Sequence, residues 1–421
     1  MGKMHSLGVP TQPKLQFCPM NVKTLTAQIL RKMPNIKRWQ FKFISTLPSL
    51  LLAMRGRYNF SNMARWGDYK EGAYRENYSR PFDWLQFNVL LAEQTLSNDL
   101  AIAFDPSFLP KSGKHTPGIG YFYSGCAGRE LRGLELSGLA VIDQQDKTAL
   151  HLEAIQTIDQ QEEESLLGFY ARSISERAEK LQQISSLLIV DAYFARLPFI
   201  DAMLEVGFNV ITRLRKDARL RYLYQGPARP GKGRPKQYDG RIDIYNLRLD
   251  LVSPCAQAED GSWIAYELTA NVQAWKRNAK LVILHELKAD GSIKSARIIA
   301  STDLEMDGGC ILLAYHSRFQ IELLYRDAKQ HLGLTHCQAR SKEKIHFHLN
   351  ASLSTVSLAK AACHLSGQNH EQKAFSLADI KTSYANELLL DQFISMFEID
   401  PQLPKIKSLR GEIRNIGKIA A

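Results

Sequence analysis

The chain has 421 residues, of which 45% are hydrophobic and 23% charged, and its formal net charge is +11. This composition is typical of a globular protein and excludes a disordered or collagen-like chain, while the positive charge favours a polyanionic partner such as nucleic acid. The six cysteines are scattered and form no Cys-x-x-Cys pair, which argues against a zinc site or a disulfide framework and fits a reducing cytosol.

The first quarter of the chain is predicted to be helical and basic. Residues 1–20 are expected to form a polar, poorly ordered arm without the apolar stretch of a signal peptide, and short helices follow over 21–95. Residues 21–80 hold twelve Lys or Arg against three acids, with aromatic residues between them. This pattern favours a helical DNA-binding domain over a merely solvated basic face. The apolar run at 47–54 is too short to span a bilayer, so no membrane partner is expected.

Residues 96–216 are predicted to form a mixed α/β sheet. The expected order is three strands in a meander, a helix, a strand, a helix closed by Gly207, and a strand. These elements are expected at 99–109, where an apolar strand ends in a polar loop, and at 133–145, 148–158, 162–184, 185–195, 196–207 and 208–215. This order is that of an α/β domain.

Residues 217–305 are predicted to be a β-rich insertion that completes no sheet of its own. The insertion opens with a basic, turn-rich stretch at 225–240, whose Gly and Pro content opposes regular structure. Strands are expected at 241–249, 262–273, 279–287 and 295–303. The second part of the α/β domain is expected at 306–345, and a helical C-terminal region at 346–421.

The run from 315 to 334 is predicted to be one helix with a polar stripe. Tyr315, Arg318, Glu322 and Lys329 lie at offsets of 0, 3, 7 and 14, which places them within an arc of roughly 60° on a helix. A carboxylate beside a guanidinium, an ammonium and a phenol can hold a metal ion and bind a phosphate. A solvated amphipathic helix with an internal ion pair explains the stripe equally well when it is taken alone.

Two aspartates stand where strands are expected to end, Asp105 on the first strand and Asp191 on the fourth. If these strands are neighbours, the carboxylates lie close together and repel each other unless a divalent cation separates them. Capping or turn aspartates are the alternative. The four apolar residues before Asp191 imply burial, which favours the metal site there. With Glu322 as the third ligand, the oxygen donors suit Mg²⁺ or Mn²⁺, as a pair of ions for phosphoryl transfer.

With these residues the chain resembles bacterial insertion-sequence transposases of the DDE type, in the insertion-sequence-four family with its Tyr-x2-Arg-x3-Glu-x6-Lys signature. Tyr315, Arg318, Glu322 and Lys329 match that signature in type and spacing. The resemblance covers roughly 95–350 and includes the segments 103–116 around Asp105, 187–195 around the second aspartate, and 329–340. Leu324 and Tyr325 stand where members often have phenylalanines.

The resemblance implies an RNase H-like mixed sheet with a β-rich insertion, and a DDE transposase of the cut-and-paste kind. Asp105, Asp191 and Glu322 would be the catalytic metal ligands, while Tyr315, Arg318 and Lys329 would bind DNA phosphates. The implied reaction is Mg²⁺-dependent endonuclease cleavage at terminal inverted repeats, often through a hairpin, followed by transfer of the 3′ ends to target DNA. The implied state is a homodimer in a synaptic complex, in the bacterial cytoplasm at the nucleoid.

Three further points remain open at this stage. In some members of the family an insertion tryptophan stacks on a flipped base, and Trp263 and Trp275 are both available, although a core role is the simpler explanation of Trp263. An RNase H-fold nuclease or resolvase that cuts without joining is one alternative function. A domesticated, non-catalytic DNA-binding protein is the other.

Overall fold

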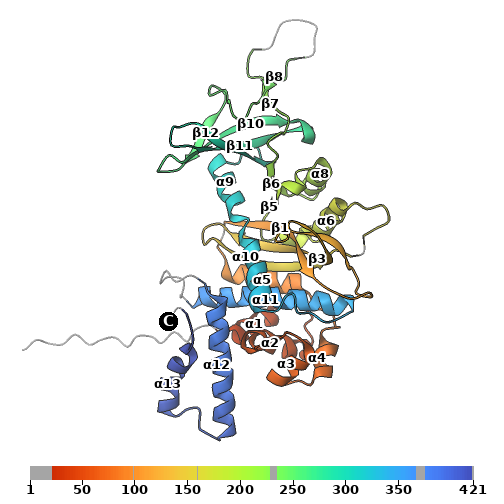
Figure 1. Cartoon of the computed structure of the whole chain (residues 1–421), viewed down its shortest axis with the longest axis vertical. Helices are drawn as coiled ribbons and strands as arrows, with labels where there is room; N and C mark the ends of the chain where they lie inside the picture. The colour runs from red at the N-terminus through yellow and green to blue at the C-terminus, as the bar shows by residue number, and fades with distance from the viewer. Residues whose placement is uncertain (1–20, 98, 159, 228–234, 367–374, 420–421) are drawn as a thin grey trace, which may run out of the picture.

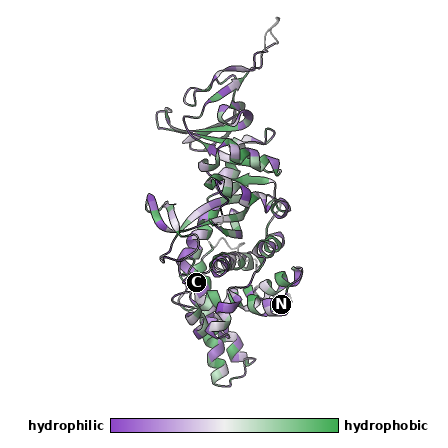
Figure 2. Ribbon diagram, turned by 90° about the vertical axis from the view of Figure 1, so that its right-hand side faces the viewer, coloured by the Kyte–Doolittle hydropathy of each residue, from purple (hydrophilic) through white to green (hydrophobic). Residues whose placement is uncertain are grey.

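The computed structural model describes residues 21–97, 99–158, 160–227, 235–366 and 375–419. The predicted N-terminal arm and the centre of the basic loop therefore lie outside the described residues. The molecule is elongated, with the insertion strands at one end, a sheet in the middle and helices at the other end (Figure 1). A view turned by 90° shows the same outline, with hydrophobic residues distributed along the strands and the inner helices (Figure 2).

Between residues 21 and 97, where the structure describes the N-terminal region, there are five helices, in agreement with the predicted helical character. They are α1 (Val22–Lys32), α2 (Arg38–Ala53), α3 (Phe60–Trp66), α4 (Glu71–Asn77) and α5 (Trp84–Thr95). The side chain of Asn59 caps α3 by accepting a hydrogen bond from the Asn62 amide. No helix of the described residues is long and apolar enough to cross a membrane.

One mixed sheet of twelve strands runs through the part of the chain that the structure describes. The order is β2-β3-β1-β5-β6-β12-β11-β10-β7-β8, with β4 beside β3 and β9 beside β10. The strands are β1 (Leu100–Pro110), β2 (Gly120–Ser124), β3 (Arg129–Asp143), β4 (Thr148–Gln156), β5 (Leu187–Ile189), β6 (Asn209–Leu214), β7 (Leu220–Leu223), β8 (Tyr238–Arg241), β9 (Ser253–Gln257), β10 (Trp263–Val272), β11 (Arg277–Leu287) and β12 (Ile293–Ser301).

The predicted meander is confirmed, because β1 pairs antiparallel with β3 and β3 pairs antiparallel with β4. The short strand β2 was not predicted. Strand β5 is parallel to β1 and β6 is parallel to β5, so the two strands that follow the meander extend it on the β1 side. The insertion strands continue the same sheet, because β12 pairs antiparallel with β6.

Several predicted elements are wrong in extent. The strand expected at 185–195 is only β5, which is followed by a short 3₁₀-helix at Ala192–Phe194. The helix expected at 162–184 is two helices, α6 (Leu166–Ser175) and α7 (Ala178–Gln182). Ser165 caps the first by accepting from the Gly168 amide, so the acids at 162–164 precede the helix. The strand expected at 241–249 is absent beyond Arg241, because Asp243 accepts hydrogen bonds from the amides of Tyr245 and Asn246 and makes a turn there.

The helix expected over 315–334 is also interrupted. The structure has α9 (Gly308–Ser317) and α10 (Gln320–His331), with a tight turn between them in which the Ile321 and Glu322 amides bond to the carbonyls of Arg318 and Phe319. Three helices follow: α11 (Lys342–Leu365), α12 (Leu377–Met396) and α13 (Pro404–Asn415). The predicted domain boundary at 345 falls inside α11, because the helix begins before its continuous apolar segment does.

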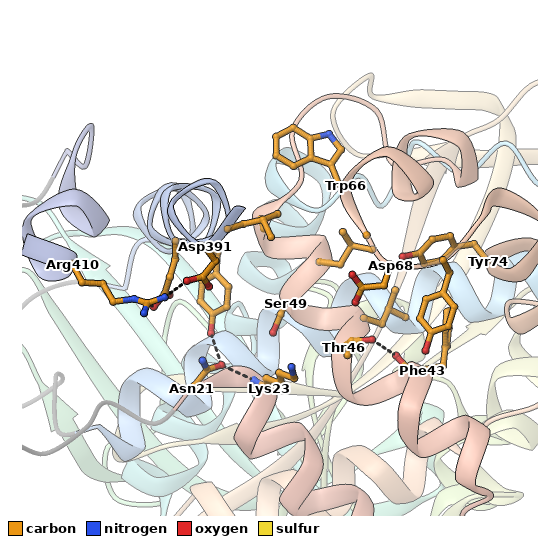
Figure 3. A pocket seen from close by; sticks show the side chains of 18 residues that line it. Asn21, Lys23, Phe43, Thr46, Ser49, Trp66, Asp68, Tyr74, Asp391 and Arg410 are labelled. Carbon is orange, nitrogen blue, oxygen red and sulfur yellow. Dashed lines mark hydrogen bonds and ion pairs between the residues drawn. The ribbon is translucent and has the colours of Figure 1, made fainter. Parts of the chain in front are cut away.

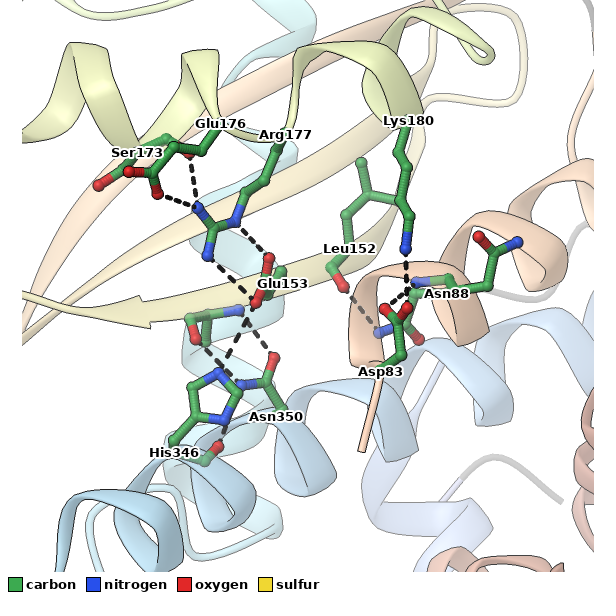
Figure 4. Close-up of polar contacts among 12 residues, drawn as sticks. Asp83, Asn88, Leu152, Glu153, Ser173, Glu176, Arg177, Lys180, His346 and Asn350 are labelled. Atoms are coloured by element: carbon green, nitrogen blue, oxygen red, sulfur yellow. Dashed lines mark hydrogen bonds and ion pairs between the residues drawn. The ribbon is translucent and has the colours of Figure 1, made fainter. Parts of the chain in front are cut away.

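Strand β4 lies at a sheet edge, and helices α5 and α11 satisfy its backbone groups through polar side chains. The Asn350 amide bonds to both the N–H and the carbonyl of Ala154, at 2.8 and 3.0 Å, and Asn88 donates to the Leu152 carbonyl at 2.8 Å (Figure 4). A partly buried ion pair between Glu153 and Arg177 joins the same strand to the α6–α7 turn. These bonds close an edge that would otherwise present unpaired groups, and they hold the helices against the sheet.

Candidate active site

Asp105 lies in the middle of β1 and not at its end, which corrects the prediction. The strand continues to Pro110, and Asp105 is paired with Gly138 of β3. Pro106 is tolerated there because the parallel pairing with β5 stops at Ala103, so the missing N–H costs no ladder bond on that side. The prediction failed because a proline after an aspartate is typical of a strand end.

Asp191 follows β5 and begins the short 3₁₀-helix η1 (Ala192–Phe194). Its carboxylate accepts from the Tyr193 amide at 2.9 Å, and its carbonyl accepts from the Thr212 hydroxyl of β6 at 2.6 Å. Since Ala103 is level with Ile189, extending the parallel register by two residues puts Asp191 level with Asp105 on the neighbouring strand. The two aspartates expected to be neighbours are therefore neighbours.

Arg318, at the turn between α9 and α10, bridges two of the three acids. Its Nη1 lies 3.1 Å from Oδ1 of Asp105, and its Nη2 lies 2.5 Å from Oε1 of Glu322. The side chains of Arg318 and Asp105 are 16% and 18% exposed, whereas that of Glu322 is 53% exposed. The Glu322 carboxylate is thus about half exposed to solvent, whereas the neighbouring ion pair between Arg318 and Asp105 is largely buried.

The other two members of the signature lie on either side of this pair. Lys329 donates from Nζ to the Ser107 hydroxyl at 2.9 Å and to the Phe108 carbonyl at 3.2 Å. Tyr315 is partly buried at the other end, and the charges of Arg318 and Asp191 influence its pKa, which burial raises. Although the helix is interrupted, Arg318 and Lys329 still lie on the same side, because both contact β1.

Asp105 is electrostatically coupled to each of the other two acids. Burial raises the pKa of Asp105 to about 7, and the charges of Asp191 and Glu322 add to that effect while Arg318 opposes it. Burial also raises the pKa of Asp191, against the Tyr193 amide and the Arg318 charge. Two partly buried carboxylates therefore share a site in which positive charge is favourable.

In the described ranges, no three His, Cys, Asp or Glu side chains are close enough together to hold a metal ion. The fit of these residues to a divalent metal is therefore judged from their donor atoms and charge. The donors are carboxylate oxygens, the type that Mg²⁺ and Mn²⁺ prefer. The raised pKa of Asp105 and the guanidinium between two acids both mark a place where a cation lowers the repulsion. The residues thus fit such an ion in donor type and charge.

Sequence reasoning missed two residues that position the first acid. The Tyr325 hydroxyl donates to the Asp105 carbonyl at 2.6 Å, although only a family difference was noted at that position. Gly138 lies opposite Asp105, and a Cβ built on it would overlap the Tyr325 hydroxyl. A glycine inside a strand is a signal of close approach and could have indicated this contact.

The two candidate tryptophans differ in accessibility. Trp275 is 1% exposed, and its indole donates to the Ala195 carbonyl at 3.1 Å, so it belongs to the core. Trp263 is partly buried and packs against a small apolar cluster made by the insertion strands, α9 and the central strands β1, β5 and β6. Neither ring is fully open to a base in this conformation.

A cavity of about 350 Å³ lies away from the acids, between the N-terminal helices and the α12–α13 hairpin (Figure 3). Three of its charged side chains pair with one another, because Arg410 forms ion pairs with Asp391 and Glu387. The Ser49 hydroxyl lacks a partner within the described chain. None of the acids or signature residues lines this cavity, so it marks a packing junction and not the candidate chemistry.

Comparison with known families gives one result. Residues 171–358 match the family described as "Transposase DDE domain". The matched range includes Asp191, Glu322 and the whole signature, and it supports a DDE transposase. Comparison with curated proteins gave no match.

Proposed function

We propose that this chain is a cut-and-paste transposase of the insertion-sequence-four family, acting through Asp105, Asp191 and Glu322. The observation that carries the proposal is the bridge from Arg318 to Asp105 and Glu322, with Asp191 just beyond the end of the neighbouring strand β5. The match to a transposase DDE domain over 171–358 supports it independently. The sheet order of an antiparallel meander followed by two parallel strands supports an RNase H-like fold.

The three carboxylates would hold Mg²⁺ or Mn²⁺, as a pair of ions. Bound divalent ions would activate a water or 3′-hydroxyl and stabilise the leaving oxygen in phosphoryl transfer. The protein's own residues position the DNA around that reaction. Lys329 supplies a point charge beside β1, Arg318 supplies a forked donor, and Tyr315 supplies a hydroxyl, all suited to phosphate oxygens.

DNA recognition is assigned to the N-terminal helices over 21–95. Several of their basic side chains are exposed, including those of Lys37, Arg38, Arg55 and Arg57. We assign the inverted repeats of the element to this helical surface. We assign the target DNA to the catalytic site formed by the three acids, which would also cut the element ends. Two ends must be cut together, so the acting species is a homodimer in a synaptic complex, at the bacterial nucleoid.

The test is cleavage of DNA that carries the terminal inverted repeats flanking this gene. The wild-type protein should nick and then join these ends with Mg²⁺, and Asp191→Asn and Glu322→Gln should reduce the rate by at least about 10³-fold while binding persists. Full activity of either variant would remove the assigned site. Cutting without joined products would indicate a nuclease or resolvase, and binding without nicking would indicate a domesticated DNA-binding protein.

A further inference from the structure

The β2–β3 hairpin carries two unusually exposed aromatic side chains. Tyr121 and Tyr123 are 70% and 63% exposed, and they lie two residues apart on β2, an edge strand. Residues at this spacing share one face of a strand, roughly 7 Å apart. Exposed apolar rings on a free strand are unfavourable unless a partner covers them.

The pairing register puts both tyrosines on the face that carries the acidic site. Asp105 is opposite Gly138, and Tyr121 and Tyr123 are opposite Arg132 and Glu130 of the same strand β3. Directly opposed residues of an antiparallel pair share a face, and every second residue along β3 shares it too. Counting from 138 by twos reaches 132 and 130, so the rings and the Asp105 carboxylate lie on one side of the sheet.

The hairpin also lies close to Lys329. That lysine contacts Ser107, which is level with Leu136, so Tyr121 is four residues further along β3 and two strands from β1. Burial lowers the pKa of Lys329, and the Cys126 thiol in the hairpin turn is near enough to oppose that shift.

The charges around the rings are mainly positive. Residues 111–133 contain four Lys or Arg and one acid, Glu130. Arg132 donates to the Gly113 carbonyl at 3.0 Å, which holds the loop of the exposed Lys114 against the hairpin. A basic surface with flat aromatic rings is suited to a nucleic-acid strand with unpaired bases, since each base offers a face for stacking and a phosphate for the cations.

We propose that the β2–β3 hairpin binds unpaired DNA next to the catalytic face, with Tyr121 and Tyr123 stacking on successive bases. This inference rests on the proposed function for the identity of the polymer as DNA. A duplex hides the faces of its bases, so the hairpin selects DNA that has opened near the site. A protein partner is disfavoured by the surrounding cations and is distinguished by the test.

Binding of the full-length protein is measured by fluorescence anisotropy in EDTA, with labelled 20-mer oligothymidylate and with a 20-base-pair duplex. Tyr121→Ala and Tyr123→Ala should each weaken binding of the single strand about tenfold, with a smaller effect on the duplex. Tyr121→Phe and Tyr123→Phe keep the rings and should bind as the wild type does. Tyr245→Ala, which removes another exposed tyrosine on the insertion, is the matched control.

Single-strand affinity within twofold of wild type in the double alanine variant would overturn the inference, as would equal loss in the phenylalanine variants. Loss of self-association without any change in DNA binding would also overturn it and indicate a protein partner. The two proposals can fail separately. Tyrosine-dependent binding by a protein that never cuts DNA refutes the transposase, whereas normal cleavage with tyrosine-independent binding refutes the hairpin site.

Discussion

The Tyr325 hydroxyl of α10 donates a 2.6 Å hydrogen bond to the backbone carbonyl of Asp105 on β1. This bond fixes the helix that carries Glu322 and Lys329 against the strand that carries the first acid. Tyr325 is 5% exposed, and burial raises its pKa well above the ordinary value, so the phenol keeps its proton and remains a donor. The relative position of the acids thus depends on a residue that is not itself acidic.

Tyr325→Phe should test this dependence. The variant loses one buried hydrogen bond, which should lower the free energy of unfolding by about 1–2 kcal/mol. The rate of DNA cleavage should fall by more than the loss of folding stability explains, because α10 is then free to shift relative to β1. Urea unfolding and single-turnover cleavage measured together would separate the two effects. Unchanged cleavage would show that α10 is positioned by its other contacts.

Gly138→Ala should disturb the same contact from the opposite side. The added methyl group would overlap the Tyr325 hydroxyl and lie 2.9 Å from its Cζ, so the ring and α10 must move. Overpacking of this kind costs about 1–3 kcal/mol of unfolding free energy. Because the hydroxyl is the nearest atom, adding Tyr325→Phe should partly restore stability. The double variant should therefore be less destabilised than the sum of the single variants, and simple additivity in a double-mutant cycle would contradict the contact.

Arg318→Ala should have opposite effects on metal and on DNA. The guanidinium now neutralises Asp105 and Glu322, so its removal leaves two carboxylates without a counter-charge. Mn²⁺ affinity in the absence of DNA should rise about tenfold, equivalent to roughly 1.4 kcal/mol, while DNA cleavage falls. Titration followed by the electron paramagnetic resonance of free Mn²⁺ measures the first effect. Arg318→Lys retains the charge and should resemble the wild type, and an unchanged Mn²⁺ affinity in the alanine variant would contradict the proposed competition.

Much of the fold follows from local pattern. The continuous apolar run of β5 and the alternating runs of β3 and β4 were predicted, and so were Gly207 at the end of α8 (Leu197–Glu205) and the long C-terminal helices. These elements agree with the structure because hydrophobic periodicity and chain punctuation determine them locally. The Asp105–Asp191 adjacency also followed, since it needs only the order of two strands.

What the sequence could not predict depends on tertiary contacts. Strand β1 runs past Asp105 because β3 pairs with it on one side, which no local signal at Pro106 indicates. The helix predicted at 315–334 breaks near Arg318, where the side chain is held by Asp105 and Glu322 across the site. The hydrogen bond from Tyr325 to Asp105 is possible because Gly138, on a strand far away in the sequence, leaves room for the phenol. In each case a long-range partner overrides the local pattern.

His151 should make the protein lose stability in mild acid. Burial lowers its pKa to about 4, against the hydrogen bond to Asn350 and the charge of Glu153, and burial lowers that of His348 to about 4 as well. An unfolded histidine takes up a proton near pH 6.5. The protein therefore has its full free energy of unfolding above that pH and loses part of it as the pH falls towards 4. Each histidine contributes a slope of up to roughly 1.4 kcal/mol per pH unit. His151→Gln does not titrate, so its urea-unfolding free energy should fall less steeply than that of the wild type between pH 6.5 and 4.5. Carboxylates titrate in both proteins and cancel in the difference, so equal slopes would show that His151 is protonated as easily in the folded state as in the unfolded one.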